Sequence, residues 1–343
     1  MLSRDESYAR YPGQAPGRDR VLHELVSSIG RTVSGDEIGR KLGMSRPAVW
    51  KHIRSLIASG FPIVPVKGSG YRLDHSLDLI VPEQVLKNLT TEAIGRTLFY
   101  VHKTGSTNND AKEMAWQSPD GSIFVAELQE LGKGRIGRTW SSPHGGVYMS
   151  ILLKPDMPPS RAPTLALVAG YAVATVLRSS FALDARVKWP NDVLVGGKKV
   201  SGVLCEMRAE ADRVVDVVVG IGINANIDPE ELPAGTRETA TSLKHLLGET
   251  VDRNPLIAHV LNSFETAYRE YLRRGMESLA GNITEIAAYL GHEVTIRNLT
   301  ATDSAETTGT FLGIDTQGRA ILGLPGGEQV AIMAGDLSLR LAP

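Results

Sequence analysis

Three glycines alternate with three cations between Gly132 and Arg138, and a tryptophan follows at position 140. Glycine lets the backbone approach a ligand closely, and the cations cannot neutralise one another, so this stretch is suited to hold an anion. A dinucleotide-binding fold needs a strand before such glycines and a helix that begins at the third one. Residues 123–129 are typical of a strand, but residues 140–146 are rich in turn-forming residues, so a doubly wound fold is not expected. We interpret the stretch as a mobile loop that closes over a phosphate-bearing ligand; a solvated basic surface loop is the alternative.

The N-terminal part of the chain is basic, although the whole chain has a net charge of −1. Residues 18–75 contain ten Lys and Arg but five Asp and Glu, a surplus of five positive charges. Apolar spacing predicts helices over residues 19–29, 36–42 and 45–57, with Ile57 facing inward, and a two-stranded wing over residues 62–73. A helix, a four-residue turn and a second helix are typical of a helix-turn-helix. We therefore predict a winged helix-turn-helix that binds DNA; a small helical bundle with solvated cations is the alternative.

The DNA-contacting residues of this module are expected on the third helix and the wing. They are Ser45, Arg46, Trp50, Lys51, Arg54 and Lys67. Residues 1–17, which are polar and rich in proline and glycine, are expected to form a disordered tail.

After a linker near residues 75–78, residues 79–287 mix helices and strands, which predicts an α+β domain. Sixteen uncharged residues, 162–177, are too few for a membrane span and predict a core helix. From residue 288 the pattern changes to five short strands, which favours a small barrel. The single cysteine, Cys205, forms no intramolecular disulfide and is expected to be a buried apolar side chain in a reducing, cytoplasmic compartment.

Four further motifs occur in order around the glycine loop or behind it. They are Thr104-Gly-Ser-Thr-Asn108, Val187-Lys-Trp-Pro-Asn-Asp-Val193, Lys199-Val-Ser-Gly-Val-Leu-Cys-Glu206 and Val219-Gly-Ile-Gly-Ile-Asn-Ala-Asn226. With these residues the chain resembles the biotin–protein ligases, specifically the bifunctional bacterial type that is ligase and biotin-operon repressor in one polypeptide. The resemblance covers about residues 20–343. Any one motif would only be suggestive, but their common order and spacing behind a helix-turn-helix are specific.

The resemblance implies a class II synthetase-like central domain, an SH3-like C-terminal barrel and a two-step reaction. Biotin and ATP give biotinyl-5′-AMP, and a lysine of a biotin carboxyl carrier protein then takes the biotinyl group. The implied catalytic residues are Lys188 and Arg135. The implied biotin-binding residues are Ser106, Thr107, Asn108, Gln129, Lys133, Gly134, Arg135 and Lys188. The implied nucleotide-binding residues are Arg135, Arg138, Trp140, Asn191 and Asn224.

Five residues have a specific argument for or against a role in this site. Lys188 is the first choice for catalysis, because its place between a predicted strand and a Trp-Pro pair makes it a preorganised cation. Many relatives carry arginine where Lys133 stands, and lysine lacks the bidentate fork that would retain the adenylate. Asp192 is a candidate for holding Mg²⁺ through water, but one carboxylate is a thin basis for a metal site. Trp140 could equally be a core aromatic, and the turn at Asn224 could be purely structural.

Two other functions stay open on the sequence alone. One is a ligand-sensing transcription factor with an inactive ligase domain, and the other is a lipoate-type acyl ligase. One winged helix binds DNA weakly at physiological salt, so repression predicts a homodimer on operator DNA. We expect its seam in the central domain, with the loop disordered when empty and ordered by ligand. No membrane association is expected.

Overall fold

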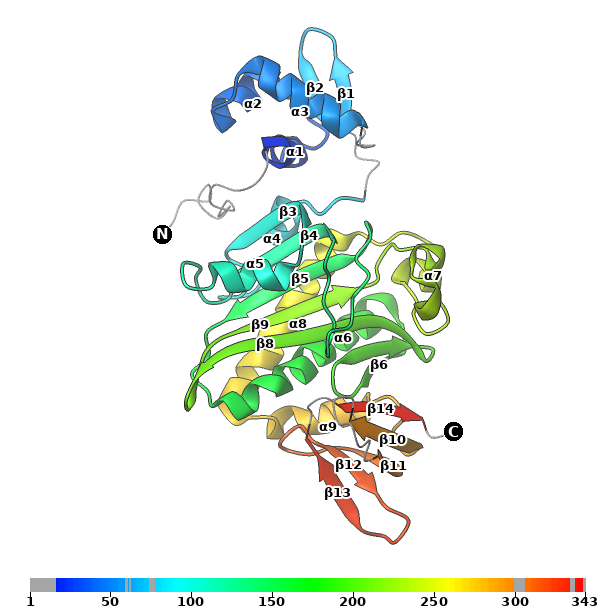
Figure 1. Cartoon of the computed structure of the whole chain (residues 1–343). Coiled ribbons are helices and arrows are strands. Elements are labelled where there is room, and N and C mark those ends of the chain that lie inside the picture. Colours follow the sequence, from blue (N-terminus) through cyan, green and yellow to red (C-terminus); the bar gives the residue numbers. More distant parts are fainter. Residues whose placement is uncertain are drawn as a thin grey trace.

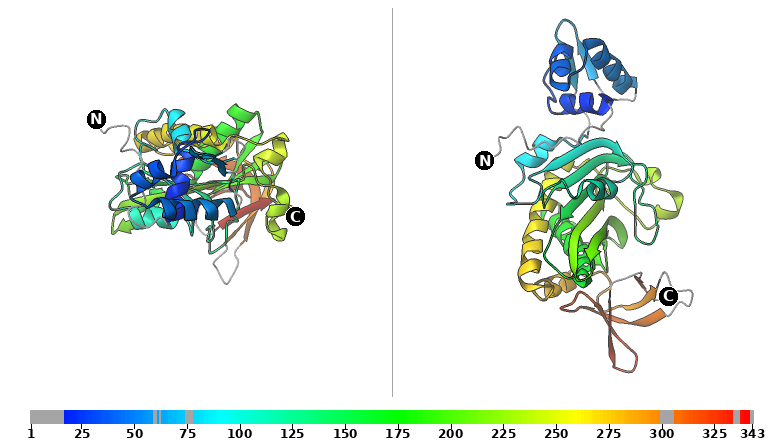
Figure 2. Two further views of the ribbon diagram at one scale, coloured as in Figure 1. Left: turned by 90° about the horizontal axis from the view of Figure 1, so that it is seen from above. Right: turned by 60° about the vertical axis from the view of Figure 1, so that its left-hand side comes forward.

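The computed structural model describes residues 17–58, 61, 63–73, 78–298, 306–333 and 337–341, and these form three successive parts (Figure 1). The small helical part lies at one end of the central domain and the last strands lie at the other (Figure 2). Most of the predicted tail and of the predicted linker, residues 1–16 and 75–77, lies outside the described residues. Gly17 was expected in the tail but begins the first helix.

The N-terminal part is the predicted winged helix-turn-helix. Its elements are α1 (Gly17–Val26), α2 (Gly35–Leu42), α3 (Arg46–Ala58), β1 (Ile63–Val66) and β2 (Gly70–Leu73). Ser34 caps α2 by accepting the Glu37 amide at 3.0 Å, and Gly43 ends it with φ +66°, a conformation that suits glycine. Two details of the prediction were wrong. The first helix ends at Val26 rather than at residue 29, and Ile57 is 39% exposed because Val49, Ile53 and Leu56 already fill the inner stripe of α3.

A seven-stranded sheet in the order β3-β4-β5-β9-β8-β7-β6 is the centre of the molecule. Its strands are β3 (Leu98–Thr104), β4 (Ile123–Gln129), β5 (Val147–Leu153), β6 (Ala185–Lys188), β7 (Asp192–Val195), β8 (Lys198–Glu210) and β9 (Arg213–Ile223). Only the β3–β4 pair is parallel. The mixed sheet confirms the expected α+β class.

Helices cover both faces of this sheet. They are α4 (Pro82–Lys87), α5 (Thr107–Met114), α6 (Leu165–Phe181), α7 (Leu243–Leu247), α8 (Arg253–Arg274) and α9 (Glu277–Glu285), with 3₁₀ turns at Pro159–Thr164, Pro229–Glu231 and Ala234–Thr236. On one face α6 and α8 bury the large apolar core, and on the other α5 packs over Phe99, Phe124 and Val218.

Among the described residues, one helical stretch, Pro159–Phe181, is long and apolar enough to cross a membrane by length and composition. It is 67% buried inside the protein, and α6 contributes most of its side chains to the core, as predicted. The helix proper begins at Leu165, because the residues before it form a 3₁₀ turn.

The C-terminal part forms the predicted five short strands. They are β10 (Glu293–Asn298), β11 (Glu306–Ile314), β12 (Ala320–Gly323), β13 (Gln329–Ile332) and β14 (Leu337–Leu341), all antiparallel in the order β13-β12-β11-β10-β14. The Trp189 indole nitrogen donates to the Gly318 carbonyl oxygen at 3.1 Å, and this bond ties the barrel to the central sheet.

Candidate functional site

A cavity of about 690 Å³ lies beside the central sheet, between the glycine loop and the strands β7, β8 and β9. Every residue predicted to hold biotin, nucleotide or Mg²⁺ lines this cavity. Tyr289 and Leu341 of the C-terminal part also reach its wall. The motifs that are far apart in the sequence therefore meet in one place.

One end of the cavity holds a chain of hydrogen bonds. The Ser150 hydroxyl lies 2.7 Å from the Thr107 hydroxyl, which donates to Gln129 Oε1 at 3.1 Å. Gln129 Nε2 donates to the Ser142 hydroxyl at 2.9 Å, and that hydroxyl donates to the Trp140 carbonyl oxygen. The chain fixes the orientation of the Gln129 amide before any ligand arrives.

Ser106 is the N-cap of α5. Asn108 is buried, and its side chain is already paired: Oδ1 lies 2.6 Å from the Ser150 hydroxyl, and Nδ2 donates to Glu206 at 2.8 Å. Asn108 thus lies in the cavity wall, but its side-chain hydrogen bonds connect β5 to β8. The buried hydroxyls of Ser142 and Ser150 were missed from the sequence, because a lone serine in a strand or turn carries no signal.

The glycine loop is a short hairpin in which Lys133 pairs with Thr139. The Gly134 amide donates to the Arg138 carbonyl oxygen at 2.7 Å, and the turn between them contains positive φ values at Ile136 and Gly137. The chain then pairs again at Gln129 and Ser142, so no helix follows the glycines.

Two cations join this hairpin to the rest of the cavity. Arg135 Nη1 donates to Asn191 Oδ1 at 3.0 Å, and Lys133 Nζ donates to Asn109 Oδ1 at 2.7 Å. Arg138 lies on the exposed side of the hairpin and still lines the cavity. The loop thus covers the cavity with positive charge.

A second group of positive charges lies below the loop. Lys188 ends β6 and precedes the cis peptide bond of Trp189-Pro190. The Trp189 side chain is 1% exposed, so the backbone beside Lys188 is fixed by packing. The sequence did not indicate a role for Lys199. In the structure its Nζ lies 2.6 Å from Asp192 and 5.0 Å from the centre of the Trp140 ring.

Two glycines form the floor beneath Trp140. Gly202 and Gly222 are partners across β8 and β9. A Cβ atom at Gly202 would lie 2.9 Å from the indole ring, and one at Gly222 would lie 2.7 Å from it. Both Trp140 and the buried Trp189 line the cavity. Asn224 Nδ2 donates to the Thr241 carbonyl oxygen at 3.0 Å, so its amide orientation is also fixed.

Two groups offer less chemistry than their residue type suggests. Asp192 is paired with Lys199, and the described part of the chain contains no cluster of three or more His, Cys, Asp or Glu suited to a metal. The Cys205 thiol is half-buried, and burial, with a smaller effect of Glu206, raises its pKa to about 12. A thiol with so high a pKa is not a nucleophile at neutral pH.

The six predicted DNA-contacting residues are all exposed on α3, at its N-cap or at the tip of the wing. The Arg54 guanidinium lies 4.9 Å above the Trp50 ring, and the Ser45 hydroxyl accepts the Ala48 amide at the start of α3. Their common exposure leaves a basic helix available to a groove of DNA.

Three protein-family descriptions match the chain. They are an HTH domain over residues 18–72, the Biotin/lipoate A/B protein ligase family over residues 98–224, and the Biotin protein ligase C terminal domain over residues 289–340. The chain is 39% identical to the Bifunctional ligase/repressor BirA of Bacillus subtilis, over 88% of this chain and 92% of that protein. It is 31% identical to the Escherichia coli protein of the same name, over 91% and 94% of the two chains.

Solved structures agree with these matches. The biotin protein ligase of Aquifex aeolicus, in complex with biotin and ATP, superimposes with a TM-score of 0.63 at 32% identity and covers 71% of this chain and 99% of its own. The chain therefore belongs to the family of bifunctional biotin–protein ligases, in which a biotin ligase and a DNA-binding repressor share one polypeptide.

Proposed function

We propose that the cavity joins biotin to ATP and passes the biotinyl group to a lysine of a biotin carboxyl carrier protein. In the first step a biotin carboxylate oxygen attacks the α-phosphorus, and pyrophosphate leaves. In the second step the lysine amine attacks the acyl carbon of biotinyl-5′-AMP, and AMP leaves. The observation that carries this proposal is the meeting of a polar pocket end, at Thr107 and Gln129, with the loop cations and Lys188 in one cavity.

The two ends of the cavity have different tasks. The polar end, with Ser106, Thr107 and Gln129, holds the ureido head of biotin, because its hydrogen-bonding groups are oriented in advance. The cationic end brings a carboxylate against a polyphosphate, and positive charge must cancel that repulsion and stabilise the transition state. Lys188 has this task; Lys133 holds the carboxylate end, and Arg135 and Arg138 hold phosphate oxygens.

The nucleotide lies between Trp140 and the turn at Asn224, beside Asn191 and Lys199. Mg²⁺ would arrive with ATP, because it prefers phosphate oxygens and water to a protein cage. Asp192, the only carboxylate among the described residues that line the cavity, would hold it through water. The bound ion would neutralise phosphate charge.

The winged helix adds operator binding, and the ligand controls it through dimerisation in the central domain. Ordering of the Gly132–Trp140 loop by the adenylate would complete the dimer surface. We further propose a cytoplasmic protein with domains over residues 17–75, 79–287 and 288–343. The element groups and the three matched regions support this division.

One assay separates the proposed reaction from its alternatives. The protein is incubated with radiolabelled biotin, ATP, Mg²⁺ and a biotin carboxyl carrier domain, and the same mixture is prepared with radiolabelled lipoate and its carrier. Biotin label on the carrier supports the ligase, and lipoate label alone would identify a lipoate ligase. Binding of biotin without label on either carrier would identify a sensor with an inactive ligase domain.

A further inference from the structure

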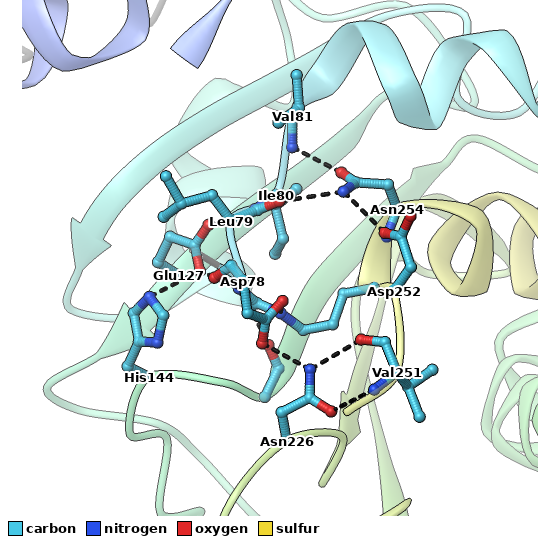
Figure 3. A network of polar contacts seen from close by, with 12 residues as sticks. Asp78, Leu79, Ile80, Val81, Glu127, His144, Asn226, Val251, Asp252 and Asn254 are labelled. Carbon is cyan, nitrogen blue, oxygen red and sulfur yellow. Dashed lines mark hydrogen bonds and ion pairs between the residues drawn. The ribbon is translucent and has the colours of Figure 1, made fainter. Parts of the chain in front are cut away.

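Arg253, the first residue of α8, is completely buried and joins three separate segments of the chain. Its Nε donates to the Asp78 carboxylate and its Nη2 to the Asp78 carbonyl oxygen, both at 2.6 Å. Nη2 also lies 2.8 Å from Glu127 Oε2, and Nη1 donates to the Gly146 carbonyl oxygen at 2.7 Å. Figure 3 shows Asp78 and Glu127 together with their other polar partners. A planar guanidinium is suited to hold several acceptors in a fixed arrangement.

Three members of this network are close in sequence to cavity residues. Glu127 lies on β4 two residues before Gln129, and Gly146 follows the Trp140–Ser142 segment directly before β5. Asn226 Nδ2 donates to the second Asp78 oxygen at 2.6 Å (Figure 3), and Asn226 is two residues beyond Asn224. Three walls of the ligand cavity therefore meet at Arg253 and Asp78.

The same network holds the point where the DNA-binding part rejoins the central domain. Only four residues separate Asp78 from Leu73, the last residue of the wing, and a chain extends at most about 3.6 Å per residue. The Ile80 amide donates to Glu127 Oε1 at 2.6 Å, and the Val81 amide donates to Asn254 Oδ1 at 2.6 Å. Segment 78–81 is thus tied directly to β4 and to the start of α8.

A second contact reaches the same place. The Phe61 ring, which belongs to the core of the DNA-binding part, lies edge-on to His102 with 4.7 Å between ring centres. His102 is on β3, and the pairing of Val101 with Ala126 and of Lys103 with Leu128 places it beside Glu127. The DNA-binding part is therefore docked on the strand pair that leads to Gln129.

We propose that the Asp78–Arg253–Glu127 network is the link that carries occupancy of the biotin site to the DNA-binding part. Arg253 is a positioning residue: one guanidinium holds both β4, the strand that carries Gln129, and segment 78–81, which leads to the DNA-binding part. Both charges of the Arg253–Glu127 pair are fully buried, and such pairs have few alternative arrangements. The inference rests on the proposed ligand-controlled DNA binding: dimerisation brings two DNA-binding parts together, and this network fixes how each of them is held on its central domain.

The test uses Asp78→Ala in the full-length protein. This change removes the Asp78 carboxylate and its hydrogen bonds to Arg253 and Asn226. Arg253 stays paired with Glu127 and Gly146, so the buried charge keeps partners. The matched control is Asp184→Ala, which removes an aspartate that binds Arg178 at 2.7 Å on the surface, outside the residues that line the cavity. The DNA probe is a duplex selected by the wild-type protein from a random pool in the presence of biotin and ATP. The affinity for this duplex and the rate of pyrophosphate release are measured with and without both ligands.

Allosteric coupling of this kind is typically about 5- to 150-fold in affinity. We expect biotin plus ATP to tighten DNA binding by the wild type and the control by such a factor, but by less than twofold in Asp78→Ala. The pyrophosphate release of the variant should stay within about threefold of the wild type, which a general loss of structure would not allow. An unchanged ligand response in Asp78→Ala, or in Asp78→Asn should the alanine variant unfold, overturns the inference. A wild-type protein whose DNA affinity ignores both ligands would instead reject the proposed repressor function.

Discussion

Lys188 and Lys199 approach the same cavity from different strands but have different surroundings. Lys199 is paired with Asp192 and lies over the Trp140 ring, whereas Lys188 is held by the packing of its neighbour Trp189. Lys188→Ala should lower the rate of adenylate formation at least tenfold, about 1.4 kcal/mol, while the dissociation constant of biotin changes less. The reason is that charge develops on the phosphate in the transition state and not in bound biotin. Single-turnover release of pyrophosphate measures the rate.

Lys103→Ala is the control for this change, because Lys103 is paired with Glu130 at 2.6 Å and does not line the cavity. Release of pyrophosphate at the wild-type rate by the Lys188 variant would remove Lys188 from the reaction. Lys199 would then be the first candidate in its place.

The buried side chain of His102 is expected to make the stability of the protein depend on pH. Burial lowers the pKa of His102 from 6.5 to about 4, and Glu127 opposes this shift only in part. The folded protein therefore holds the neutral ring, while the unfolded chain takes up a proton as the pH falls through 6.5. The contribution of His102 to the free energy of unfolding is complete above pH 6.5 and decreases as the pH falls to 4, by on the order of 3 kcal/mol.

Urea denaturation at pH 7 and at pH 5 measures this loss, and the comparison is with His102→Leu. Because carboxylates such as Glu265 and Asp315, whose pKa values are lowered in the fold, also titrate in acid, only the difference between the two proteins counts. We expect a smaller decrease in the variant than in the wild type. Equal decreases would contradict the burial of a neutral ring, and the exposed His259 provides a control for mutation of a histidine.

At the residue scale the motifs predicted which side chains gather in one place. The loop cations, Lys188 and Gln129 all reach one cavity. The residues that support them were not predictable, because Ser142, Ser150, Lys199 and Arg253 function through contacts between distant segments. Arg253 in particular is the first residue of a long amphipathic helix, where an arginine is usually exposed and not completely buried.

At the element scale the strands and the long helices were predictable from apolar periodicity. The two short helices α7 and α9 were not predicted. The order of the strands was also beyond prediction. The pairing of Gly202 with Gly222, which makes room for Trp140, exists only once β8 and β9 lie side by side.

This glycine floor leads to a prediction for Gly222→Ala. The added Cβ would lie 2.7 Å from the Trp140 indole, so the ring must move away from the floor, and such overpacking costs about 1–3 kcal/mol. We expect the KM for ATP to rise at least about fivefold, with a smaller change in the KM for biotin, whose polar end lies at Thr107 and Gln129. Steady-state release of pyrophosphate gives both constants when ATP is varied at saturating biotin and biotin is varied at saturating ATP.

Gly281→Ala is the matched control, because a Cβ at this position in α9 meets nothing within 4 Å. Unaltered KM for ATP in the Gly222 variant would show that Trp140 does not border the nucleotide. An equal rise for both substrates would indicate a general disturbance of the sheet instead.

At the scale of the whole molecule, three parts are joined by a few specific contacts. The Trp189–Gly318 hydrogen bond connects the C-terminal strands to the turn that follows Lys188, and the Arg253 network connects segment 78–81 to β4. The sequence predicted the three parts from changes in charge and periodicity but not these joints, because each joint pairs residues more than a hundred positions apart.

Repression requires the whole molecule, because the DNA-binding part alone is a weak binder. A single winged helix makes few phosphate contacts and binds weakly at physiological salt, whereas a dimer reads two half-sites on one duplex. The apolar side chains of the DNA-binding part mostly form its own core, so we expect the seam in the central domain, near the glycine loop that the adenylate contacts. Biotin plus ATP should therefore raise both self-association and operator affinity, by about 5- to 150-fold. Sedimentation velocity and DNA titration with and without both ligands measure the two effects, and biotin alone is the control. Dimerisation that proceeds equally without ligand, or DNA affinity that does not follow dimerisation, would reject this switch while leaving the ligase reaction intact.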